Sequence, residues 1–136
     1  MQTFLPYNDF VQSAQVLDRQ RLGKQRVETL QLLKALRGET KGWVNHPAAK
    51  MWAGYENCLV VYGVAMCDEW IKRGYKDTCR EKILAYRDYT TAVVVPPWLG
   101  REDFHESHRS NLLRKDPEYY YKFGWTEPTN LEYVWK

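Results

Sequence analysis

Hydrophobic residues recur with helical spacing along most of this chain. Between residues 17 and 36 the leucines at positions 22, 30, 33 and 36 lie at helical spacing, and Gly38 follows as a typical helix C-terminal cap. The pattern predicts a helix over 17–36. Its first half is very polar for a helix that must also bury a face, and Arg26 falls among the leucines. A guanidinium in that position must be paired or face a polar cleft.

A second apolar pattern runs through the middle of the chain. Large apolar residues recur every three or four positions from Trp52 to Trp70, and three valines make the centre apolar nearly all round. The pattern predicts one long buried helix that Pro47 opens and Gly74 closes. At ~1.5 Å per residue this helix would be roughly 40 Å long.

Shorter patterns complete the predicted fold. We expect extended chain before Pro6, a short helix capped by Asn8 through about Val16, and another capped by Asp77 or Thr78 through about Arg87. A third main helix is expected over 102–115, ending before Pro117. The run AVVVPPWLG looks like a strand, but its prolines favour an extended connection. The rest, EYYYKFGWTEPTNLEYVWK, is expected to be irregular. The fold class is therefore all-α, with three main helices and one or two short ones.

Composition sets further bounds. The 136 residues suit a single domain, 1–136, and 44% hydrophobic residues are enough for a core. No run is apolar enough to cross a membrane, and the N-terminus lacks a signal-peptide pattern. Three cysteines without a CxxC motif predict buried free thiols in a reducing cytoplasm. His46, His105 and His108 lack a third partner at metal-ligand spacing, so no metal site is expected.

Basic residues form two clusters although the net charge is only +3. Such clusters are typical of nucleic-acid surfaces, and equally of solvated helix faces. The first cluster comprises Arg19, Arg21, Lys24 and Arg26, and the second comprises Arg109, Arg114 and Lys115.

Aromatic residues follow the second cluster directly. Tyr119, Tyr120 and Tyr121 precede Lys122 and two further rings. Bases with interleaved aromatics suit a nucleic-acid surface, where cations hold phosphates and rings stack on bases. A flap covering the core is the equal alternative. Three consecutive tyrosines cannot all point inward, so at least one ring should be free to stack.

Glu28 lies on the flank of the first predicted helix that also carries Arg21 and Lys24. Lys24 and Glu28 have the spacing of an ordinary i,i+4 ion pair, and the residues alone favour that interpretation over a catalytic one.

Three stretches together resemble a known family. They are the early helix, with Leu17, Gln20, Leu22, Glu28 and Leu30 in matching order, then CDEWIKRGYKD, then DPEYYYKFG. They resemble the pyrimidine-dimer DNA glycosylases of the bacteriophage endonuclease V type. The resemblance implies an all-α monomer that binds double-stranded DNA and acts as a glycosylase and AP lyase, without cofactor or metal.

The resemblance also implies a mechanism. In the family the N-terminal α-amine attacks C1′ of the damaged nucleotide and forms a Schiff base, a glutamate assists, and β-elimination cleaves the strand. Here Gln2 is bulky, so we expect Met1 to be retained as the nucleophile, with Glu28 as the glutamate. An α-amine in general titrates closer to neutral pH than a lysine.

The chain departs from the family pattern in two places. Val27 stands where the family has an arginine directly before the glutamate, and about five additional residues lie upstream. Two alternatives therefore stay open: a non-catalytic relative that binds DNA or a modified nucleotide, and an all-α structural protein without a nucleic-acid role.

Overall fold

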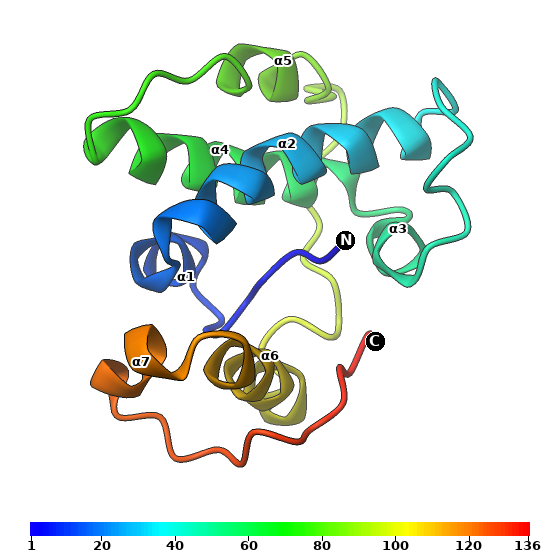
Figure 1. Cartoon of the computed structure of the whole chain (residues 1–136). Helices are drawn as coiled ribbons and strands as arrows, with labels where there is room; N and C mark the ends of the chain where they lie inside the picture. The colour runs from blue at the N-terminus through cyan, green and yellow to red at the C-terminus, as the bar shows by residue number, and fades with distance from the viewer.

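The computed structural model describes all 136 residues and contains helices, turns and extended segments but no strand, which confirms the all-α prediction. Two of the three main helices, α2 and α6, lie where the sequence predicted them; α2 and α4 cross in one layer and α6 lies in a second layer below them (Figure 1). The elements are α1 (Phe10–Val16), α2 (Arg19–Leu36), α3 (Pro47–Trp52), α4 (Glu56–Lys72), α5 (Arg80–Leu84), α6 (Glu102–Lys115), α7 (Pro117–Tyr120) and a 3-10 turn, η1 (Tyr121–Phe123).

Acidic side chains fix where the first two helices begin. The Asp9 carboxylate accepts the Gln12 N–H at 2.8 Å, so Asp9 caps α1 and the predicted cap at Asn8 is wrong by one residue. The Asp18 carboxylate accepts the Arg21 N–H at 3.3 Å and starts α2.

The long helix predicted from Pro47 to Gly74 is in fact two helices. Gly54 has a φ of +87°, which favours glycine and stops α3 before α4 starts. The apolar spacing continues through this turn, which is why the pattern concealed it. The break gives α3 its own direction, and the Trp52 indole N–H donates to Thr3 Oγ1 at 3.0 Å. It thus places α3 against the N-terminal segment.

The later part of the chain also differs from the prediction in detail. The helix expected from residue 77 to about 87 is confined to α5, although the Asp77 carboxylate does accept the Arg80 N–H at 2.8 Å. The segment after Pro117, predicted to be irregular, begins with α7 and η1 before the irregular tail runs along α6 (Figure 1). In the run AVVVPPWLG, residues 92–96 belong to no helix or strand, as predicted, whereas residues 97–100 form turns instead of an extended chain.

One core of 25 buried residues joins the layers, with Trp52, Tyr62, Phe104 and Tyr120 among its largest side chains. The three cysteines are buried free thiols, as predicted. No group of three or more His, Cys, Asp or Glu side chains could hold a metal ion. None of the helices combines the length and the apolar character needed to cross a bilayer.

Residues 1–7 form an extended segment that runs between the α2–α4 pair and α6 (Figure 1). It has no neighbouring strand. Side chains of three helices bond its backbone instead: Gln25 from α2, Tyr62 from α4 and His108 from α6. The free end of the segment therefore emerges at a fixed place beside α2.

Candidate functional site

A polar hollow of about 300 Å³ opens where the first residues meet α2 and the end of α6. We call it the amine hollow. It brings together Met1 and Glu28, which the sequence paired, and three of the predicted basic residues from both clusters. Its lining residues are Met1, Gln2, Phe4, Gln20, Arg21, Lys24, Gln25, Glu28, Lys115 and Tyr133.

Glu28 lies next to the N-terminal residue. Its Oε2 accepts the Gln2 N–H at 3.2 Å, one peptide unit from the Met1 amine. Lys24 and Glu28 do not form the ion pair that their spacing suggested. No nitrogen of a basic side chain lies within 4.0 Å of a Glu28 carboxylate oxygen. The half-buried carboxylate is thus available to a ligand, among cations that would hold phosphates.

His46 is a nearby group that the sequence did not assign to this site. Its pKa lies below the usual value, first because of burial and second because of the positive N-terminal amine, while Glu28 acts in the opposite direction. The Ala48 N–H donates to His46 Nδ1 at 3.0 Å, and the rings of Trp43 and Trp135 contact the imidazole edge to face. A titratable ring is therefore held within electrostatic reach of Met1 and Glu28.

A second, larger hollow of about 810 Å³ also lies along α2 and is next to the amine hollow. We call it the aromatic hollow. It shares Gln20, Lys24 and Glu28 with the amine hollow, three residues spaced four apart on α2. Glu28 therefore borders both. The lining residues are Arg19, Gln20, Gly23, Lys24, Val27, Glu28, Gln31, Trp70 and Tyr75.

Two rings form the wall of the aromatic hollow. Trp70 and Tyr75 have their centroids 4.4 Å apart, and the Trp70 indole N–H donates to the Lys76 carbonyl at 2.9 Å. A Cβ at Gly23 would meet the Trp70 ring at 3.0 Å, so the glycine lets the ring approach α2. This wall is held in place before any ligand binds.

Arg26 does not line either hollow. Its guanidinium pairs with Asp77 and lies 4.3 Å from the centre of the Trp70 ring, so it is paired as the sequence required. Burial alone would raise the pKa of Asp77, but hydrogen bonds from the Arg80 N–H and from Arg26 outweigh it and lower the pKa. Arg26 is two residues from Glu28 and points to the opposite side, where it supports Trp70 instead of facing solvent.

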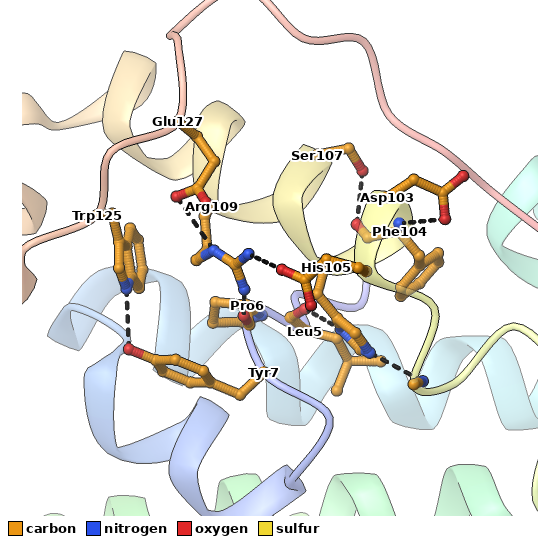
Figure 2. A network of polar contacts seen from close by, with 12 residues as sticks. Leu5, Pro6, Tyr7, Asp103, Phe104, His105, Ser107, Arg109, Trp125 and Glu127 are labelled. Carbon is orange, nitrogen blue, oxygen red and sulfur yellow. Dashed lines mark hydrogen bonds and ion pairs between the residues drawn. The ribbon is translucent and has the colours of Figure 1, made fainter.

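Arg109 is likewise turned into the protein, as Figure 2 shows. Its guanidinium donates to the Pro6 carbonyl and to Glu102, each at 2.7 Å, and its Nε lies 3.1 Å from a Glu127 oxygen. The residue is only 9% exposed. The sequence grouped Arg109 with the DNA contacts because its partners, far away along the chain, were not visible there. We leave it out of the proposed DNA surface.

The three tyrosines divide as the sequence predicted. Tyr120 is fully buried, where its hydroxyl bonds Asp18 at the start of α2, and Tyr119 is half-buried and donates to the Leu17 carbonyl at 3.4 Å. Tyr121 is 71% exposed, and Lys122 lies 3.9 Å from the Tyr119 ring. Tyr120 thus behaves as part of a flap, whereas Tyr121 is free to stack. Arg114 and Lys115 are also exposed.

A family model described as pyrimidine dimer DNA glycosylase matches residues 1–82 of the 136. The chain belongs to the pyrimidine dimer DNA glycosylase family, which confirms the resemblance found in the sequence. The match covers the N-terminal segment, α2 with Glu28, and α4 with Trp70; it ends before α6. No curated protein and no solved structure matches the chain. Membership makes DNA the expected substrate and DNA repair the expected role.

Proposed function

We propose that the protein is a DNA repair glycosylase with AP-lyase activity on damaged pyrimidines in duplex DNA, with the Met1 α-amine as nucleophile. The observation that carries the proposal is the amine hollow. There the N-terminal residue and the Glu28 carboxylate share a wall with Arg21, Lys24 and Lys115. The cations suit the phosphates on either side of a damaged nucleotide.

The proposed reaction uses the Met1 α-amine, the Glu28 carboxylate and water. The lone pair of the neutral amine attacks C1′, and the glycosidic bond breaks with its electron pair going to the leaving base, which is protonated. The sugar ring then opens to a Schiff base between C1′ and the amine. Glu28 stabilises the positive charge that develops on the sugar and carries protons between these steps. Loss of a C2′ proton expels the 3′ phosphate and cleaves the strand, and water releases the enzyme.

The aromatic hollow supplies a place for a base outside the duplex. A glycosylase must expose the sugar carbon that it attacks, so a base that leaves the stack needs an apolar wall. Trp70 and Tyr75 offer one directly beside Glu28. With the sugar at Glu28, the base would lie in the aromatic hollow and the amine would approach from the other side.

The proposal is tested by trapping the Schiff base. Incubation with pyrimidine-dimer duplex and borohydride should give a covalent adduct that peptide mapping locates at Met1. Acetylating the amine should abolish the adduct and leave DNA binding within about twofold, since the amine is one contact among many. The undamaged duplex of the same sequence is the control.

Two results would contradict this mechanism. An adduct that persists after acetylation would move the nucleophile to a lysine. Selective binding of damaged duplex without any adduct would favour the second candidate, a non-catalytic binder of DNA or modified nucleotides. Val27 favours that candidate, because the family has an arginine at this position.

A further inference from the structure

The N-terminal segment is bonded like a strand of a sheet, although side chains take the place of the neighbouring strands. The Phe4 carbonyl accepts from the Tyr62 hydroxyl at 2.9 Å, and the Leu5 N–H donates to His108 Nδ1 at 2.9 Å. The carbonyl of Leu5 bonds a second histidine of α6, with His105 Nδ1 at 2.8 Å. Each of these bonds crosses from the segment to a different position on α4 or α6, so the segment cannot slide along its own axis.

Gln25 is the partner nearest the amine. Its Nε2 donates to the Gln2 carbonyl at 2.8 Å, and its Oε1 accepts the Phe4 N–H at 3.0 Å. In a parallel sheet, a residue bonds two groups of the neighbouring strand. One is the carbonyl of the residue that precedes the residue opposite, and the other is the N–H of the residue that follows it. The Gln25 amide makes this same pair of bonds around Thr3. The Tyr62 hydroxyl has a single proton, which the Phe4 carbonyl and Gln25 Oε1 share, and this contact favours the Gln25 amide in this orientation.

Gln25 and Glu28 act on the same residue from the same helix. They are three positions apart on α2 and therefore share a face. Gln25 holds the Gln2 carbonyl, and Glu28 accepts the Gln2 N–H at 3.2 Å. Both polar groups of the Gln2 backbone are fixed, and Met1, the one residue before this anchor, lines the amine hollow. Gln25 is 1% exposed, so water does not compete for its bonds.

We propose that Gln25 is the positioning residue that sets the place of the Met1 amine relative to Glu28. The proposal rests on the proposed function, in which that amine attacks C1′. In this role the nearly fully buried Gln25 acts through the backbone of residues 2 and 4, which both of its amide bonds reach, and not on the sugar or the base. A displacement of about 1 Å at a reacting atom can cost ~10²-fold in rate.

The test compares two variants with the parent protein. Gln25→Met keeps the volume of the side chain and removes both bonds to the segment. Ser110→Ala is the matched control, since Ser110 is buried, donates to the Pro128 carbonyl and accepts the Leu131 N–H at 3.1 Å, all away from the amine hollow. Both variants lose a donor and an acceptor for backbone groups, which are buried around Gln25 and partly buried around Ser110. The readouts are the single-turnover rate of borohydride trapping, the Kd for damaged duplex, and hydrogen exchange of the Gln2 amide.

We expect Gln25→Met to trap ~10²-fold more slowly while the Kd stays within about twofold, and the Gln2 amide to exchange much faster. Ser110→Ala should keep the parent's trapping rate at a temperature well below its Tm. Gln25→Glu, which keeps the acceptor for Phe4 and loses the donor to Gln2, should lie between them. If Gln25→Met does not fold, Gln25→Glu takes its place in the comparison.

Two outcomes would overturn the assignment of Gln25. One is a trapping rate in Gln25→Met within about twofold of the parent. The other is an equal loss of rate and affinity in Gln25→Met and Ser110→Ala, which would mean general destabilisation. If the parent itself forms no adduct, the proposed function fails. Hydrogen exchange of the Gln2 amide then still tests the positioning role of Gln25. Unchanged exchange in Gln25→Met refutes that role, and faster exchange supports it.

Discussion

Two regions on either side of the N-terminal segment bring acidic and basic side chains together, and they differ in how completely these charges are paired. Around Arg109 the guanidinium has three partners within the protein, on Pro6, Glu102 and Glu127. Around Glu28 the carboxylate has one backbone partner, and Lys115 beside it has no ion pair. The first region is closed, and the second opens into the amine hollow.

The difference separates charges that hold the fold from charges that can hold a ligand. A buried charge with all its partners inside the protein stabilises one conformation, and removing a partner is costly. An open charge contributes little to stability but keeps its field for an incoming phosphate. Sequence clusters mix the two kinds, as Arg109 and Lys115 on α6 illustrate.

The comparison is tested most strongly by Arg109→Met. Removing the buried guanidinium leaves the half-buried Glu127 unpaired, so the free energy of unfolding should fall by about 3 kcal/mol. Arg114→Met, on the exposed side of α6, should change it by less than about 0.5 kcal/mol. Denaturant titration measures both, and equal effects would erase the distinction between the regions.

Glu28→Gln should show the reverse behaviour. The amide keeps an oxygen for the Gln2 N–H, so stability should be nearly unchanged. Turnover should fall ~10²-fold or more, the scale of a lost acid–base group, while DNA binds at least as tightly because an anion is removed. Glu81→Gln, an exposed acid on α5, serves as the control. A parent-like rate in Glu28→Gln would rule out its catalytic role.

The closed region should also make the fold sensitive to acid. Burial first, and the nearby His105 second, lower the pKa of His108 to about 3. The unfolded chain takes up a proton below about pH 6.5 and the folded chain does not, so stability is lost as pH falls from there toward 3. We expect a loss of about 2 kcal/mol between pH 7 and pH 5 from this group. His108→Asn, which keeps an acceptor for Leu5, should flatten the curve in pH-dependent denaturation; a curve as steep as the parent's would assign the effect elsewhere.

Tyr120 and Tyr121 extend the comparison to the aromatic rings. Tyr121→Ala should leave the Tm nearly unchanged and weaken binding to damaged duplex by ~1–3 kcal/mol if the ring stacks on a base. Tyr120→Ala should instead lower stability by about 3 kcal/mol, since its ring is fully buried. Thermal melting and fluorescence titration separate the two effects. Unchanged binding in Tyr121→Ala would exclude stacking.

The smallest expected effect is on salt dependence. Lys115→Ala should reduce the slope of log K against log salt by about 0.9 if the ammonium contacts one phosphate. Lys82→Ala on α5 is exposed and lies away from both hollows, so its slope should match the parent's. Affinity that does not depend on salt at all would contradict binding of DNA to this surface.

Much of the fold followed from the sequence because helical periodicity is local. The three main helices and the buried cysteines needed only spacing and composition. The break at Gly54 was missed because Tyr55 and Leu59 continue the apolar spacing through it. A glycine within the pattern was the available signal.

The candidate site was predicted less completely. Glu28 and Met1 came from the resemblance, and the structure adds that they line one hollow. The internal partners of Arg109 could not be predicted, because Pro6 and Glu127 meet it only in the folded chain. Gln25 gave no signal either, since a glutamine in a polar helix looks like solvated surface, although it is 1% exposed.

The side chains that bond the backbone of the N-terminal segment also determine when this segment can take its final place during synthesis. Leu5 and Pro6 bond to His108 and Arg109, each 103 positions later in the chain. The segment is made first, yet its partners on α6 leave the ribosome only when most of the protein has been translated. Until then the segment has its partners on α2, α3 and α4 but none on α6, and enzymes that modify nascent chains can reach the amine. The α-amine proposed as the nucleophile is therefore open to modification until α6 has been made and has packed against the segment.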